Sequence, residues 1–174
     1  VEFASDYNPK GYIGWQTTAD KGYWFNGCAS LKTVILPTTS THTYIGSKTF
    51  NSCTSLEEIV IPSCFTSIGE AAFEKCTALT ELTSPEGCTT LGNCVAKNAG
   101  IKKLTLPTTL TTLNGSENFW GCPMEEIVGL GDTQLTSIPK YCFRGYTNYK
   151  GETLVLPNTL ETIGHQCLAD MGKD

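Results

Sequence analysis

The sequence predicts an α/β solenoid: a curved, right-handed stack of short coils with a parallel β-sheet on its concave face and short strands with helical or 3₁₀ turns on its convex side. Three observations lead to this fold class. A short apolar motif recurs along the chain, a proline closes most of its copies, and successive copies are 22 to 27 residues apart. Internal repeats of this length are typical of solenoids, in which each repeat forms one coil.

The clearest copy of the motif starts at Cys53 and reads C-T-S-L-E-E-I-V-I-P-S-C-F-T-S-I. Leu56, Ile59 and Ile61 have the L-x-x-I-x-I spacing of a short strand, and Pro62 ends it because proline cannot donate a ladder hydrogen bond. The positions equivalent to Pro62 are 37, 62, 85, 107, 130 and 157, with leucine at 130. We therefore expect about six leucine-rich repeats within residues 28–174, since such repeats are roughly 20 to 29 residues long.

The second half of each repeat recurs as a further extended piece followed by one turn of helix or 3₁₀ structure. Its extended anchors are Ile45, Ile68, Leu91, Leu113, Ile138 and Ile163, four of them followed by glycine. Its turn anchors are Phe50, Phe73, Val95, Phe119, Phe143 and Leu168. One repeat buries five or six such anchors at ~1.5–3 kcal/mol each, which is less than the ~1.5 kcal/mol per residue lost on ordering it. The coils must therefore stack to be stable.

Both ends of the chain differ from the regular repeats. Residues 1–27 are rich in aromatic side chains, among them Trp15 and Trp24. They predict an N-terminal cap or a degenerate repeat, because a solenoid needs an atypical unit over its last core layer; an aromatic patch that binds a glycan or peptide is the alternative. The chain stops after the Leu168 segment without an obvious cap, so we expect the array to be truncated at its C-terminus.

The nine cysteines follow the register of the repeats. Cys28, Cys53, Cys76 and Cys122 stand just before the apolar run, and Cys94, Cys142 and Cys167 share a second place. Free cysteine is a small, readily buried hydrophobe, which favours stacked thiols in the core. Disulfides are the alternative, although an odd number cannot all pair within one chain.

Charge and motif content exclude several function classes. A net charge of -5, from 12 basic and 17 acidic residues, provides no basic patch for nucleic acid. No apolar run approaches the ~20 residues that cross a bilayer, which predicts no membrane insertion by this segment. Zinc sites need closely spaced ligands, and neither C-x-x-C nor H-x-x-x-H occurs. We expect no metal and no cofactor.

An enzymatic function is also disfavoured by the sequence. Only His42 and His165 could act as bases near neutral pH, and they lie in different repeats. A thiol hydrolase that pairs His165 with Cys142 or Cys167 would have to use cysteines at core positions. The sequence predicts that the chain is not an enzyme.

Strand alternation identifies the residues that point away from the core, because successive side chains of a strand face opposite sides. One outward column is mostly β-branched and apolar: Ile35, Val60, Thr83, Thr105, Val128 and Val155. The column beside it is mostly charged: Thr33, Glu58, Glu81, Lys103, Glu126 and Thr153. These twelve residues are the predicted partner-binding face, since concave solenoid faces serve as binding surfaces. Strand propensity and solubility could account for the same residues without a partner.

The motif at Cys53, continued by Gly-Glu-Ala-Ala-Phe-Glu-Lys to Cys76, resembles the BspA-like, or Treponema pallidum type, leucine-rich repeat. The resemblance covers about residues 25 to 171, with an insertion near residues 146 to 151. It implies a cell-surface or secreted protein, mostly of bacterial origin, that adheres to a host matrix protein, another cell-surface protein or a glycan. No catalytic residue belongs to the repeat. The leading hypothesis is therefore a non-catalytic protein-binding or adhesion module; a structural spacer that presents another domain and an intracellular scaffold are the alternatives.

Overall fold

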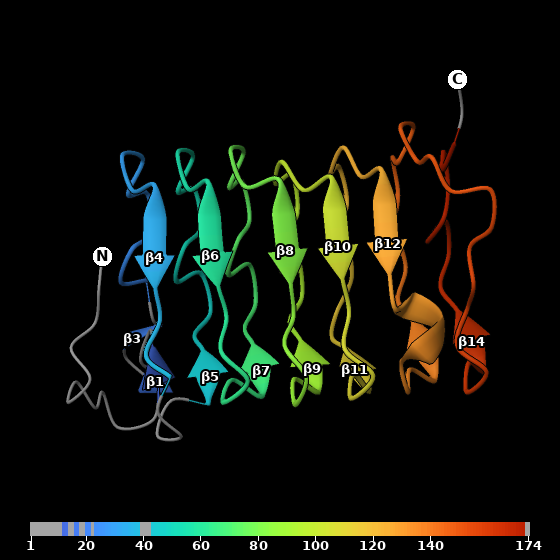
Figure 1. The fold of residues 1–174 in the computed structure, drawn as a ribbon, viewed down its shortest axis with the longest axis horizontal. Coiled ribbons are helices and arrows are strands. Elements are labelled where there is room, and N and C mark those ends of the chain that lie inside the picture. Colours follow the sequence, from blue (N-terminus) through green and yellow to red (C-terminus); the bar gives the residue numbers. More distant parts are fainter. Residues whose placement is uncertain (1–11, 14–15, 18–19, 22, 39–42, 173–174) are drawn as a thin grey trace.

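The chain forms a solenoid of parallel strands in which successive coils lie side by side (Figure 1). This computed structural model describes residues 12–13, 16–17, 20–21, 23–38 and 43–172. Each regular coil contributes a three-residue strand to one row and a two-residue strand to a second row. The predicted solenoid of about six coils is confirmed.

The first sheet contains the strands predicted from the L-x-x-I-x-I motif. These strands are β4 (Thr33–Ile35), β6 (Glu58–Val60), β8 (Glu81–Thr83), β10 (Lys103–Thr105) and β12 (Glu126–Val128). β4 pairs with β6, and β8, β10 and β12 pair in that order, all in parallel and in register. No strand pairing joins β6 to β8 among the described residues, and Figure 1 shows the wider spacing there. The first sheet therefore consists of two blocks with an open seam between them.

The second sheet is built from the Ile-Gly segments. Its strands are β1 (Tyr12–Ile13), β5 (Tyr44–Ile45), β7 (Ser67–Ile68), β9 (Thr90–Leu91) and β11 (Thr112–Leu113), and β13 (Ser137–Ile138) pairs with β14 (Thr162–Ile163) further along the chain. A small antiparallel pair, β2 (Gln16–Thr17) and β3 (Asp20–Lys21), lies near the N-terminus. The glycine after the strand is required by close packing of the coils, because a Cβ on Gly92 would lie 2.4 Å from the backbone of Gly69.

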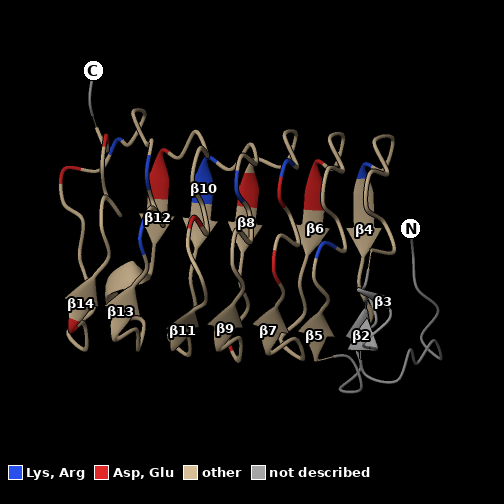
Figure 2. Ribbon diagram, turned by 180° about the vertical axis from the view of Figure 1, so that it is seen from behind, with Lys and Arg blue, Asp and Glu red and all other residues tan. Residues whose placement is uncertain are grey.

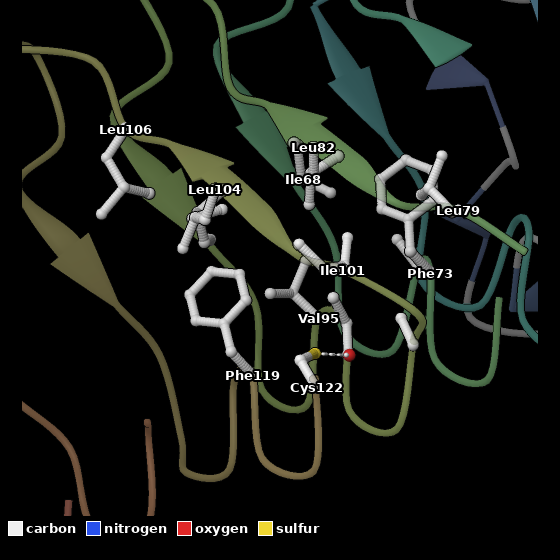
Figure 3. Packing of buried hydrophobic residues seen from close by; sticks show 14 of the residues in the cluster. Ile68, Phe73, Leu79, Leu82, Val95, Ile101, Leu104, Leu106, Phe119 and Cys122 are labelled. Atoms are coloured by element: carbon white, nitrogen blue, oxygen red, sulfur yellow. Dashed lines mark hydrogen bonds between the residues drawn. The ribbon is translucent and has the colours of Figure 1, made fainter. Parts of the chain in front are cut away.

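The core between the two sheets is made of columns of equivalent residues from successive coils. Leu82 and Leu104 are buried and point inward from neighbouring strands, as Figure 3 shows. The rings of Phe50 and Phe73 stack with centroids 5.5 Å apart, and those of Phe119 and Phe143 with centroids 5.6 Å apart. These columns confirm that the coils share one continuous core.

The cysteine column adds hydrogen bonds between coils. The thiol of Cys53 donates to the carbonyl of Phe25 at 3.0 Å, and that of Cys76 donates to the carbonyl of Phe50 at 3.0 Å. The thiol of Cys122, which Figure 3 shows, donates to the carbonyl of Ala96 at 3.1 Å. All nine cysteines are free thiols in the structure. Most are buried as predicted, whereas Cys28 is exposed and both Cys64 and Cys94 are partly exposed.

In the regular coils, the segments predicted as helical or 3₁₀ turns form turns and not regular helix. Alternate backbone N–H groups donate to the next coil, as in Phe73 to the carbonyl of Val95 at 2.8 Å and Lys75 to that of Lys97 at 2.9 Å, while the N–H of Glu74 donates locally to the carbonyl of Ala71 at 3.3 Å. Each such segment also contains residues with positive φ, for example Ala71 and Lys75, which a helix cannot accommodate. Within the described part of the chain, the one helix is η1 (Leu130–Asp132), a 3₁₀ turn.

Two register assignments made from the sequence are also wrong. The backbone N–H of Phe73 donates to the carbonyl of Val95, and the backbone N–H of Ala96 donates to the carbonyl of Asn118. In this register Ala96, and not Val95, is the equivalent of the phenylalanine in the other coils. Cys94 then lies one position before the place of Cys142 and Cys167, at φ 52°. Spacing from the strand carries this signal: Cys94 is three residues after Leu91, whereas Cys142 and Cys167 are each four residues after their isoleucine.

The sixth predicted strand, around Val155, does not form. Residues 153–156 have no strand pairing, and the backbone of Lys150 bonds to the carbonyl of Glu125 at 3.0 Å. The inserted residues before this segment change the register, so Thr153 and Val155 do not continue the sheet.

The cap or degenerate repeat predicted for residues 1–27 stays a prediction. Tyr12 and Ile13 pair in parallel with β5, and the ring of Phe25 stacks on Phe50 with centroids 5.5 Å apart. Trp15 lies outside the described residues, and Trp24 is half-buried.

A Ser84→Ala substitution will leave the free energy of unfolding unchanged or raise it by up to about 1 kcal/mol. Ser84 is 3% exposed, occupies the inward place held by Leu106 in the next coil, and its hydroxyl has no hydrogen-bond partner. Urea denaturation measures the change. Thr133→Val is the control: the Thr133 hydroxyl donates to the carbonyl of Leu130 at 2.8 Å, and its loss costs about 1 kcal/mol. A loss larger than that control for Ser84→Ala would contradict the assignment of an unsatisfied hydroxyl.

Candidate binding face of the first sheet

The outward side chains of the first sheet form two parallel columns across five strands. The apolar stripe consists of Ile35, Val60, Thr83, Thr105 and Val128, and the charged column consists of Thr33, Glu58, Glu81, Lys103 and Glu126. Strand register places equivalent members opposite each other, as for Ile35 with Val60 and Thr105 with Val128. Ten of the twelve predicted residues therefore lie on one face.

The apolar stripe is exposed to an extent that is unusual for side chains of its kind. Val60 is 65% exposed, Ile35 56% and Val128 37%. The strand residues that precede the stripe, such as Val34 before Ile35 and Leu82 before Thr83, are buried. Thr83 is exposed and Thr105 is half-buried. A row of exposed β-branched side chains on a sheet leaves apolar surface available to a partner.

The charged column divides into a neutralised part and an acidic part. Lys103 lies 3.2 Å from Glu126 and Lys102 3.7 Å from Glu125, which Lys150 also contacts. Figure 2 shows the resulting alternation, with acidic segments at the start of β6, β8 and β12 and a basic one at the start of β10. Among the described residues, neither Glu58 nor Glu81 forms an ion pair.

A cleft of about 580 Å³ follows the seam between β6 and β8. It is lined by Glu57, Glu58, Ile59, Val60, Ile61, Thr80, Glu81 and Thr83. Glu57 is paired with Lys32 at 3.2 Å, which leaves Glu58 and Glu81 as the unpaired charges of the cleft. Four of these residues, Glu58, Val60, Glu81 and Thr83, belong to the predicted binding face, whereas the cleft itself was not predicted. The available signal was that Glu58 and Glu81 are like charges in adjacent repeats.

Thr153 and Val155 do not belong to a strand that pairs with β12. Both are exposed, but they contribute to a smaller pocket of about 240 Å³ that also contains Ile127, Leu130 and Tyr149. Their assignment to the partner-binding face stays a prediction.

The buried cysteines Cys122, Cys142 and Cys167 have the properties of core residues and not of nucleophiles. Burial raises the pKa of Cys167 to about 11 and that of Cys122 to about 12, and it raises the pKa of Cys142 well above its ordinary value. A thiol with such a pKa stays protonated near neutral pH and is a poor nucleophile. His165 is exposed and its ring meets the edge of Tyr141; His42 lies outside the described residues.

The part of the chain that the structure describes lacks two other kinds of site. It contains no group of three or more histidine, cysteine or acidic side chains placed to hold a metal ion. It also contains no helix with the length and apolar character needed to span a membrane.

The stacked coils and the exposed sheet face define a leucine-rich repeat solenoid. Residues 21–126 and 100–173 match the family model described as "BspA type Leucine rich repeat region", in six copies, so the chain belongs to that family. Membership indicates a protein-interaction or adhesion module. Families with this fold are typically non-catalytic binding modules that bind proteins. No curated protein matches the chain.

Solved structures agree with this assignment. The leucine-rich repeat protein of T. pallidum is 27% identical with a TM-score of 0.67, over 80% of this chain and 63% of that one. A leucine-rich repeat protein from Bacteroides ovatus is 27% identical with a TM-score of 0.64, over 84% of this chain and 43% of that one. One from Eubacterium ventriosum, 20% identical with a TM-score of 0.53 over 77% of this chain and 42% of that one, shares the fold. The chain thus spans less than two thirds of the length of these proteins.

Proposed function

We propose that the chain is a recognition module that binds a partner protein through the outward face of the first sheet, in a cell-surface or secreted protein of bacterial origin. The observation that supports this most is the exposed apolar stripe, with Val60 65% and Ile35 56% exposed beside a charged column. An apolar strip bordered by charge has the layout of an interface. Nothing in the internal packing requires these side chains to be apolar, since their strand neighbours fill the core.

Exposure of apolar surface favours binding over a purely spacing role. A spacer needs only a stable stack, and exposed threonine or lysine would serve it equally well while limiting aggregation at the sheet. Burial of Ile35, Val60 and Val128 by a partner would remove apolar area from water, at roughly 25 cal/mol per Å². The charged column would then select among partners by electrostatic complementarity.

Binding should be lost when the charge of the acidic part is reversed. We expect Glu58→Lys/Glu81→Lys to weaken the affinity for a protein ligand at least tenfold, about 1.4 kcal/mol. Biolayer interferometry of the immobilised chain against a panel of purified extracellular-matrix proteins measures it. The control, Glu70→Lys/Glu161→Lys, makes the same charge change at exposed acids outside the first sheet.

Binding should also depend on the apolar stripe. Ile35→Ser/Val60→Ser should also weaken binding at least tenfold, with a thermal melt close to that of the unchanged chain. Equal affinity of all variants would rule out the first sheet as the binding face. Absence of binding to every matrix protein, together with binding on a glycan array, would assign a glycan partner instead.

A further inference from the structure

The seam between β6 and β8 provides a site whose occupant can be specified by its chemistry. In every other described pair of neighbouring strands of the first sheet, the backbones are joined by a ladder of hydrogen bonds. Between residues 57–61 and 80–84 no backbone hydrogen bond occurs. The facing edges of β6 and β8 therefore present unpaired N–H and C=O groups to the cleft.

The width of the seam limits what can enter it. Cα atoms of β6 and β8 still approach within 8 Å of each other. An added strand would need roughly 9.5 Å between them, twice the usual strand spacing. The seam is therefore too narrow for an added strand, and the cleft of about 580 Å³ along it provides room for a side chain.

The charges of the cleft specify a cation. Glu58 and Glu81 line it together, and neither has a counter-ion on the described part of the chain. Lys103, which stands opposite Glu81 in the register, instead lies 3.2 Å from Glu126. Like charges on adjacent strands are destabilising, so a positive group placed between them would relieve their repulsion.

The remaining lining favours a guanidinium over other cations. Val60 is 65% exposed and supplies an apolar wall for an aliphatic stem. Two carboxylates and the free carbonyl groups of the strand edges offer several acceptors, and a guanidinium has five donors in a planar fork. A lysine ammonium has three donors and is more strongly hydrated.

We propose that the β6–β8 cleft receives an arginine side chain of the partner protein, with its guanidinium between Glu58 and Glu81 and its stem on Val60. This inference rests on the proposed function, because it names the group that the first sheet recognises. It makes the cleft the determinant of specificity and the apolar stripe the surrounding contact area.

The test uses the tripeptide Ac-Gly-Arg-Gly-NH₂ as a probe and amide chemical shifts of the ¹⁵N-labelled chain as the readout, at 150 mM NaCl. We expect saturable shifts confined to residues 57–61 and 80–84. Ac-Gly-Lys-Gly-NH₂ should bind at least threefold more weakly. The citrulline peptide, which has nearly the same shape without the charge, should produce no saturable shift.

Variants of the chain complete the test. Glu58→Gln/Glu81→Gln should weaken arginine-peptide binding at least tenfold, whereas Glu70→Gln/Glu161→Gln should leave it unchanged. Equal shifts with the citrulline peptide, equal binding by the two double variants, or displacement of the peptide from these residues by 5 mM CaCl₂ would overturn the proposal, the last in favour of a metal ion.

The two proposals fail in different ways. If the peptide leaves residues 57–61 and 80–84 unaffected while matrix-protein binding still depends on Ile35 and Val60, the arginine cleft is wrong and the binding face stands. If the peptide binds in the cleft but protein binding is insensitive to every first-sheet variant, the proposed function is wrong.

Discussion

A Phe73→Ala substitution will lower the free energy of unfolding by about 3 to 5 kcal/mol. Phe73 is fully buried, and its ring stacks on Phe50 at 5.5 Å with an interplanar angle of 9°. The next coil has Ala96 in the equivalent place, so the column of phenylalanine rings does not continue on that side. Because each coil contacts only its neighbours, the loss weakens both interfaces of the coil that carries Phe73.

Urea denaturation followed by circular dichroism measures this change. Val60→Ala is the matched control, since Val60 is 65% exposed on the outer face and its truncation should shift the free energy by no more than about 0.5 kcal/mol. A Phe73→Ala effect as small as that of Val60→Ala would mean that the coils do not share a packed core.

Stability will fall steeply as the pH rises from about 9 to about 11, because the folded protein holds thiols that the unfolded chain would ionise. Burial raises the pKa of Cys53 and Cys88 to about 11 and of Cys76 and Cys122 to about 12. An unfolded cysteine has a pKa of about 8.5. Their contribution is complete below the unfolded pKa and is lost progressively until the pH passes the folded pKa.

The slope follows from the proton balance. Above about pH 9 the unfolded chain binds fewer protons than the folded one, so the free energy of unfolding decreases by up to about 1.4 kcal/mol per pH unit for each buried thiol. The double variant Cys76→Ala/Cys122→Ala should reduce the slope near pH 10 by roughly 2.7 kcal/mol per unit. Urea denaturation between pH 8 and pH 10.5 measures both. A flat profile for the unchanged chain would show that its thiols are accessible to water in the folded state.

The repeat spacing predicted most of the architecture because each coil buries equivalent residues against the next coil in the same way. The strands around Val34, Ile59, Leu82, Leu104 and Ile127 form where the motif places them. Alternation along the strand then fixes which side chains face outward. Those outward residues could be identified without any knowledge of the second sheet or the turns.

The errors arose where a local pattern competes with contacts between coils. Glu-Ala-Ala-Phe-Glu-Lys has high helix propensity, but the N–H groups of Ala71, Phe73 and Lys75 donate to the following coil, and this outweighs a weak local preference. Val155 fits the strand motif, yet after the preceding insertion residues 153–156 do not pair with β12. In both cases the deciding hydrogen bonds join residues more than 20 positions apart.

The seam between β6 and β8 was not predicted from the sequence, because the repeat motif does not distinguish one coil from another. Motif matching treats all coils as equivalent, whereas pairing depends on the particular side chains of two neighbours. Glu58 faces Glu81 across the seam, while the neighbouring charges Lys103 and Glu126 attract each other across a closed ladder. A comparison of charge signs between adjacent repeats would have singled out this pair.

Hydrogen exchange of the chain in complex with a protein that it binds in the interferometry assay tests the assignment of the binding face most directly. We predict that peptides covering β4, β6 and β8 gain protection in the complex, most strongly at residues 57–61 and 80–84, while those covering β7, β9 and β11 exchange as in the free chain. Protection confined to the second sheet or to the turn segments would contradict the account.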